Sequence, residues 1–147
     1  MPAALKSLRQ RVETAIDAVT GFSVSKHPYN VFARDPSSVL HQRFAVGVPT
    51  TTAVPNSRQR TTDGAVCNTV IAVTYCMRVK PKDQVASLDE ALDAEAAIVK
   101  AVMAETAALR ADASISFSGV SMRDVDPAGE WIIGEIEFNA LHVLDLD

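Results

Sequence analysis

Two long runs of alternating side chains constrain the fold of this chain more than any other feature. They extend from Val66 to Val79 and from Trp131 to Leu144. Successive side chains of a β-strand point to opposite faces, so each run predicts a long strand with one apolar face. The apolar faces carry Cys67, Thr69, Ile71, Val73, Tyr75, Met77 and Val79 in the first run and Ile132, Ile136, Phe138 and Ala140 in the second. One-sided strands of this kind are typical of an antiparallel sheet that buries one face.

The opposite faces of the two runs differ in character. The second run presents Glu135, Glu137 and Asn139 there, which is the pattern of a solvated surface. The first run presents a mixture of polar and apolar side chains, namely Val66, Asn68, Val70, Ala72, Thr74 and Arg78. A mixed outer face suits a surface that another subunit covers.

Two helices are expected to cover the apolar face of the sheet. The first runs from about Pro2 to Val19, where apolar residues recur at helical spacing. The second begins at Ser87, because Ser87 and Glu90 match a capping box, and it reaches about Leu109. Its expected buried residues are Leu88, Leu92, Ile98, Val99 and Val102, with Ala91, Ala94 and Ala101 allowing close approach.

The remaining segments predict shorter strands and their connections. Phe44 to Val48 and Ile115 to about Val120 alternate as strands. Between the first two strands, Pro49 to Ala65 is a long polar connection. A short helix is expected from Asp35 to His41 inside an otherwise irregular stretch, and a turn at Asp126–Gly129 precedes the last strand.

Together these elements predict a single α+β domain that spans residues 1–147. The expected order is helix, strand, strand, helix, strand, strand. Two helices would cover one face of a four-stranded antiparallel sheet and form a two-layer sandwich, with residues 49–65 as an extended loop or arm.

Composition and charge exclude several classes of function. The net charge is −4 and the chain has no block of basic residues, whereas a protein that grips nucleic acid usually carries a Lys/Arg stripe. No apolar run approaches the roughly 20 residues of a membrane span. Cys67 and Cys76 lie on opposite faces of one strand, roughly 30 Å apart at about 3.3 Å per residue, so they cannot pair with each other. Two lone thiols fit a reducing cytoplasm.

The candidate chemical groups do not form a recognisable catalytic, cofactor or metal site. His27, His41 and His142 are scattered, whereas metal ligands cluster. Asp124, Asp126 and Glu130 read as solvated turn carboxylates, because the order of oxygen ligands that a calcium loop needs is absent. The glycines match no phosphate-binding pattern. We therefore expect a protein that is not an enzyme and that uses no cofactor or metal.

The charges on the long connection allow two interpretations. Arg58, Arg60 and Asp63 lie within it. They can simply keep a solvated loop soluble, or they can form a contact arm, since long loops in compact domains are often functional. The sequence leaves both interpretations open.

Four segments, spread over most of the chain, resemble the tail terminator (tail completion) proteins of long-tailed bacteriophages. Residues 43–48 resemble the first strand of that family and residues 72–79 its central strand. Ser87 to Met103 resembles the helix that follows, and residues 131–138 resemble the closing strand.

The resemblance implies a structural virion protein. Members of this family form a ring, commonly six-fold, on the head-proximal end of the finished tail tube. The ring stops polymerisation of the tube protein and joins the tail to the head, and DNA passes through it. The implied partners are other copies of the chain, the tail tube protein and a connector protein of the neck.

A ring subunit needs two different surfaces that meet head to tail. The residues expected at the subunit or tail-tube interface are Arg58, Arg60, Asp63, Arg78, Glu135 and Glu137. Two other functions stay open: another head–tail joining protein of the neck, and a small-ligand-binding or enzymatic α+β domain with a pocket of convergent polar groups.

Overall fold

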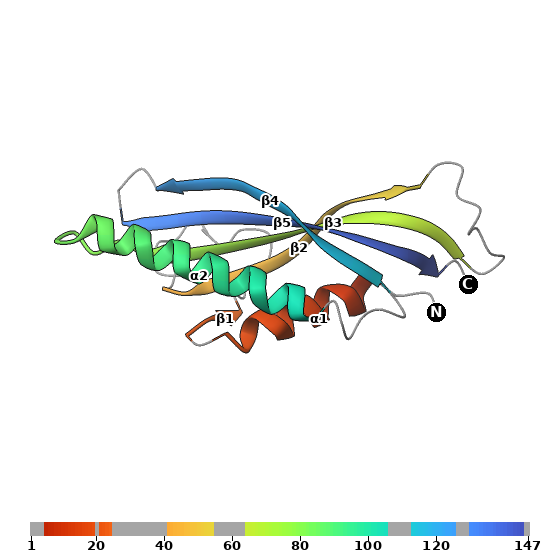
Figure 1. The fold of residues 1–147 in the computed structure, drawn as a ribbon, viewed down its shortest axis with the longest axis horizontal. Coiled ribbons are helices and arrows are strands. Elements are labelled where there is room, and N and C mark those ends of the chain that lie inside the picture. The colour runs from red at the N-terminus through yellow and green to blue at the C-terminus, as the bar shows by residue number, and fades with distance from the viewer. Residues whose placement is uncertain are drawn as a thin grey trace.

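The chain folds into a strongly twisted sheet with two helices on one face (Figure 1). The computed structural model describes residues 5–19, 21–24, 41–54, 64–105, 113–125 and 130–145. Its elements are α1 (Leu5–Asp17), β1 (Ser23–Val24), β2 (Arg43–Ala53), β3 (Gly64–Arg78), α2 (Gln84–Glu105), β4 (Ala113–Val125) and β5 (Trp131–Asp145). The predicted α+β class, with both helices on one face, is confirmed.

The sheet has five strands rather than the expected four, in the order β1-β2-β3-β5-β4. The additional strand, β1, is two residues long and runs parallel to the start of β2, opposite Arg43 and Phe44. The Ser23 amide donates to the Gln42 carbonyl and the Arg43 guanidinium donates to the Val24 carbonyl. These bonds join segments that are 19 residues apart in the chain, so no pattern within either segment could predict the pairing.

Strand β2 is longer than predicted and shortens the expected loop. It continues to Ala53 and pairs with β3 after a register shift between Gly47 and Thr50. Pro49 lies at this bulge, where a residue without an amide proton is tolerated. Beyond it the β-branched Thr50–Thr52 segment suits a strand, so the polar composition of this stretch did not mark a loop. Residues 55–63 of the expected loop lie outside the described residues.

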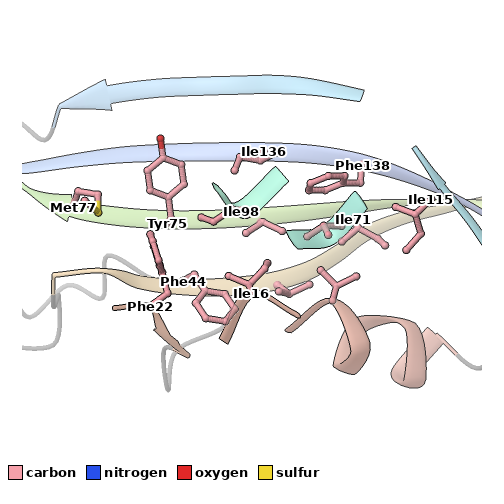
Figure 2. Packing of buried hydrophobic residues seen from close by; sticks show 14 of the residues in the cluster. Ile16, Phe22, Phe44, Ile71, Tyr75, Met77, Ile98, Ile115, Ile136 and Phe138 are labelled. Carbon is pink, nitrogen blue, oxygen red and sulfur yellow. The ribbon is translucent and has the colours of Figure 1, made fainter. Parts of the chain in front are cut away.

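The core lies between the helices and the face of the sheet that the alternation predicted (Figure 2). All seven odd-numbered residues from Cys67 on β3 to Val79, just after the end of the strand, are at most 7% exposed. Helix α1 contributes Leu8, Val12 and Ile16, all buried. The rings of Phe22 and Phe44 meet edge to face, with centroids 6.4 Å apart, and anchor β1 to the sheet.

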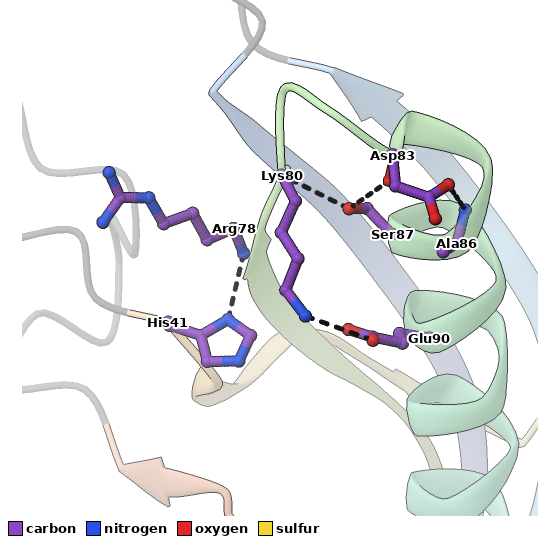
Figure 3. Close-up of polar contacts among 7 residues, drawn as sticks. All are labelled: His41, Arg78, Lys80, Asp83, Ala86, Ser87 and Glu90. Carbon is purple, nitrogen blue, oxygen red and sulfur yellow. Dashed lines mark hydrogen bonds and ion pairs between the residues drawn. The ribbon is translucent and has the colours of Figure 1, made fainter.

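The start of α2 differs from the predicted capping box (Figure 3). The helix begins at Gln84, and Asp83 caps it, since its Oδ1 accepts a hydrogen bond of 3.0 Å from the Ala86 amide. Ser87 is instead buried within the first turns, where its hydroxyl donates to the Asp83 carbonyl and accepts from the Lys80 amide. Glu90 forms an exposed ion pair with Lys80 at 3.4 Å.

Two leucines that the sequence placed in the core are exposed. Leu88 is 45% and Leu92 is 39% exposed, whereas Ala91, Ile98 and Val102 are buried as predicted. The helix turns Ala91 and Glu95 toward the sheet, and this orientation carries the two leucines to its flank. The physical reason is that Glu95 finds two partners on the sheet, which are described below.

The remaining predictions concern the ends of single elements and the segments that connect them. Helix α1 ends at Asp17, and Gly21 follows it with φ +89°, a conformation that favours glycine. Strand β4 runs from Ala113 to Val125 and exceeds the stretch predicted from Ile115 to Val120. His41 lies in a turn, while residues 35–40 of the expected short helix and residues 126–129 of the expected turn lie outside the described residues. Within the described part of the chain, neither helix is long and apolar enough to cross a membrane.

Candidate functional site

Three of the six predicted interface residues lie on the outer face of the sheet, the face opposite the helices. Arg78 stands opposite Trp131, Glu135 opposite Thr74 and Glu137 opposite Ala72. Arg78 therefore lies four positions along β3 from Thr74, the residue opposite Glu135, which is about 13 Å along the strand. Arg58, Arg60 and Asp63 lie outside the described residues.

The structure does not bring Arg78 and the two glutamates together. Within the described segments, no ion pair joins Arg78 to Glu135 or Glu137. Glu135 instead accepts a hydrogen bond of 3.1 Å from the Ser121 hydroxyl of β4. The Arg78 amide donates to His41 Nδ1 at 3.1 Å, beside the start of α2 (Figure 3). The outer face thus carries charges at separate points rather than one charged cluster.

His41 is exposed, but partial desolvation of its ring lowers its pKa, and the nearby Lys80 and Arg78 act in the same direction against Glu90. Ala45 and Cys76 are buried on the outer face and contact Trp131. Cys67 is buried on the helix-bearing face, so the prediction that the two thiols point to opposite faces is confirmed, and both are free. This outer face is mixed, as the alternation of β3 predicted.

Most of the exposed large apolar side chains lie on two elements, α2 and β4. Of the seven large hydrophobic residues that are exposed in the described part, three lie on α2 and three on β4. We call these six residues the α2–β4 apolar edge: Val85, Leu88, Leu92, Phe117, Met122 and Val125. Val85 is the most exposed of them, at 72%. Sequence reasoning missed this surface because helical spacing marks apolar residues without showing whether a partner element covers them.

A buried carboxylate, that of Glu95, joins α2 to β4. Glu95 Oε1 accepts from Arg123 Nη2 at 2.6 Å, and Oε2 accepts from Arg123 Nε at 2.9 Å and from the Tyr75 hydroxyl at 2.8 Å. The Glu95 side chain is 8% exposed. Burial alone would raise its pKa, but the bonds from Arg123 and Tyr75 outweigh burial and lower it. Burial and the bond to Glu95 raise the pKa of Tyr75.

A second group of hydrogen-bonded side chains joins β2, β3 and β5. The Thr51 hydroxyl lies 2.9 Å from that of Thr69, which lies 2.7 Å from Nε2 of His142. Thr69 and His142 are buried, and the Nδ1 atom of His142 is buried without a hydrogen-bond partner. Burial lowers the pKa of His142, although the nearby backbone of Val143 opposes the change. The ring therefore holds its neutral form in the folded protein.

Neither of these two hydrogen-bonded groups, the one around Glu95 and the one around Thr69, has the form of a metal or ligand site. Among the described residues, no group of three or more His, Cys, Asp or Glu side chains could hold a metal ion. A shallow hollow of about 480 Å³ lies on the outer face of α1, and its described lining residues all come from that one helix: Ser7, Gln10, Arg11, Thr14, Ala15 and Ala18. Ligand pockets usually draw polar groups from several elements, and this hollow draws its described lining from one.

Comparisons with known proteins leave the family undetermined. No protein-family model and no curated protein matches the chain. A solved structure from Akkermansia muciniphila, described as lacking its transmembrane region, aligns over 100% of this chain and 90% of its own, with 8% identity and a TM-score of 0.35. A similarity at this level carries no argument about function.

Proposed function

We propose that this protein is a tail terminator subunit of a long-tailed phage. It forms a ring of six copies on the head-proximal end of the tail tube. There it stops addition of the tube protein and offers a surface to the connector protein of the neck. DNA passes through the ring without specific binding, and the protein resides in the virion.

The α2–β4 apolar edge is the observation that carries the proposal. Val85, Leu88 and Leu92 follow one stripe of α2 at spacings of three and four residues, so they form an apolar strip rather than single scattered residues. The Glu95–Arg123 bonds hold both elements in one rigid body, so the surface is preorganised for a partner. A protein whose task is to dock needs such a surface more than it needs a pocket.

The two lateral edges of the sheet also suit a ring. One edge is formed by β4 and the other by β1 and β2, so the two edges differ in sequence and shape. A subunit that joins through two different edges associates head to tail, and such association closes into a ring when the rotation between neighbours divides a full turn. A symmetric dimer would need only one edge.

The test is to mix the purified protein with tail tubes and image the tube ends by negative-stain electron microscopy. We expect rings at one end of each tube and tubes that stop lengthening. The double substitution Leu88→Glu/Leu92→Glu should abolish capping, because it places two charges on the α2–β4 apolar edge. Ala104→Glu, at an exposed position near the end of the same helix, is the matched control and should cap normally.

The alternatives give different results in the same experiment. A neck protein would leave tube ends bare and bind the head-side connector instead, with the same sensitivity to Leu88→Glu/Leu92→Glu. A ligand-binding domain would show neither association. Failure of the wild-type protein to cap tubes or to stop their growth refutes the terminator assignment.

A further inference from the structure

The buried side of α2 does not coincide with its apolar side. The buried positions of the helix are Ser87, Ala91, Glu95, Ile98 and Val102. At about 100° per residue, these five positions centre on one direction around the helix axis. The large apolar residues centre roughly 70° away from that direction, and they are Val85, Leu88, Leu92, Ile98, Val99, Val102 and Met103.

This displacement leaves part of the apolar side of α2 uncovered. Leu88 is 45% and Leu92 is 39% exposed, whereas the much smaller Ala91 is 1% exposed. Val99 and Met103, further along the same side, pack partly against the core. Burial of apolar area alone would turn the helix so that the two leucines faced the sheet, because each would bury more apolar surface than an alanine does. Another interaction must therefore oppose this rotation.

The carboxylate of Glu95 is placed to oppose the rotation. One of its oxygens lies 2.6 Å from Nη2 of Arg123 on β4, and the other lies 2.9 Å from Nε of Arg123 and 2.8 Å from the hydroxyl of Tyr75 on β3. Bonds from a guanidinium to a carboxylate fix direction as well as distance. Turning the leucines toward the sheet would carry Glu95 away from Arg123, and a buried carboxylate without these bonds is strongly unfavourable.

The three side chains also couple the helix to the border of the sheet. Glu95 belongs to α2, Tyr75 to β3 and Arg123 to β4, which is the last strand in the order of the sheet. The Glu95 side chain is 8% exposed, but that of Arg123 is 49% exposed. The cationic side of the group is therefore accessible to solvent and to another protein.

We propose that Glu95, Arg123 and Tyr75 form an orientation lock for α2. While the bonds hold, α2 displays Leu88 and Leu92 at the surface. When the bonds are lost, the helix turns and buries the two leucines against the sheet. The lock thus decides whether the α2 part of the α2–β4 apolar edge is available to a partner. Its use in capping rests on the proposed function, whereas the lock itself is a property of the fold.

The test is thiol labelling of Leu88→Cys in the full chain. The native Cys67 and Cys76 are 4% and 0% exposed, so a maleimide dye should react first at the new thiol. We add Glu95→Leu, which keeps a side chain of similar size but cannot bond to Arg123. Labelling should slow by about fivefold or more, because apolar burial favours the turned helix. A helix that merely loosened would label at the same rate or faster, since local opening exposes its residues.

Two controls separate the lock from general effects of substitution. Glu90→Leu removes an exposed carboxylate from the same helix and should leave the labelling rate of Leu88→Cys unchanged. Ala104→Cys, at an exposed position of α2, should label equally fast with and without Glu95→Leu. If circular dichroism shows that Glu95→Leu does not fold, Glu95→Gln takes its place. It keeps a neutral acceptor and should slow labelling by about twofold or more.

The sign of the change decides the outcome. Unchanged or faster labelling of Leu88→Cys in the folded Glu95 variant overturns the lock. Tube capping by the Glu95→Leu protein with Leu88 intact then tests its use. Slower labelling with normal capping supports the lock and overturns its role in docking. Failure of the wild-type protein to cap tubes refutes the terminator function and leaves the labelling result as it stands.

Discussion

Replacing Gly134 by alanine should destabilise the fold more than any other single-methyl addition at a described strand glycine. Gly134 stands opposite Tyr75 on the neighbouring strand. A Cβ atom built there would lie 2.3 Å from Tyr75 Cε1, 2.4 Å from Cζ and 2.6 Å from the hydroxyl oxygen. Ordinary van der Waals contact begins near 3.4 Å, so the ring must move by about 1 Å or more.

The ring has little freedom to move. Tyr75 is 0% exposed, and its hydroxyl is held by Glu95 at 2.8 Å. Overpacking a core costs about 1–3 kcal/mol, and weakening a hydrogen bond to a charged group adds about 1–3 kcal/mol. We expect Gly134→Ala to lower the free energy of unfolding by about 2–6 kcal/mol. For a chain of this length the melting temperature should fall by about 10 °C.

Gly47→Ala is the matched control in the same sheet. The nearest atom to a Cβ at Gly47 is the Ala72 carbonyl oxygen at 3.9 Å, so the methyl group fits. This variant should be neutral or gain up to about 1 kcal/mol, because alanine restricts the unfolded chain. Urea unfolding followed by circular dichroism measures both variants.

A third variant separates the clash from other effects of the methyl group. In a Tyr75→Leu background the clashing ring atoms are absent, so adding Gly134→Ala should cost little beyond the cost of Tyr75→Leu itself. The double-mutant cycle should give a coupling energy about as large as the Gly134→Ala penalty. Equal stability of the Gly134→Ala and Gly47→Ala proteins would refute the reasoning.

Three further predictions concern the polar groups. Because the pKa of Glu95 is lowered, its charged form stabilises the fold above pH about 4.5, and this contribution is lost as the pH falls through the folded-state pKa. The stability of Glu95→Gln should therefore depend less on pH in this acidic range than that of the wild type. The pKa of His142 is lowered because burial disfavours its charged form, so the unfolded chain binds the proton more tightly than the folded protein does. The contribution of His142 to stability is therefore fully present above pH about 6.5 and decreases below it. The decline in unfolding free energy between pH about 7.5 and about 5 should be smaller in His142→Gln. Asp83→Ala should lower the free energy of unfolding in urea by about 0.5–2 kcal/mol because it removes the cap of α2. Glu90→Ala should change stability by less than about 0.5 kcal/mol because its ion pair with Lys80 is exposed. A larger loss of stability in Glu90→Ala than in Asp83→Ala would support the capping box of Ser87 and Glu90 instead.

The alternation of the two long strands was enough to determine the core face of the sheet. Side chains on β3 alternate strictly, so one apolar set from Cys67 to Val79 can be buried only on one side, and the opposite side must carry Arg78 and Thr74. Composition and the helical spacing of Leu8, Val12 and Ile16 likewise determined that α1 would bury these residues. Both patterns are periodic within one element, and such patterns are readable from sequence alone.

Only the tertiary structure decided which apolar residues of α2 are covered. Its apolar and alanine positions span more than one stripe, and the partners of Glu95 on β3 and β4 selected the orientation that exposes Leu88 and Leu92. The pairing of β1 with β2 likewise depends on residues far apart in the chain. The sequence by itself determined what each element could bury, and long-range contacts decided what each one does bury, because burial depends on the neighbour as much as on the residue.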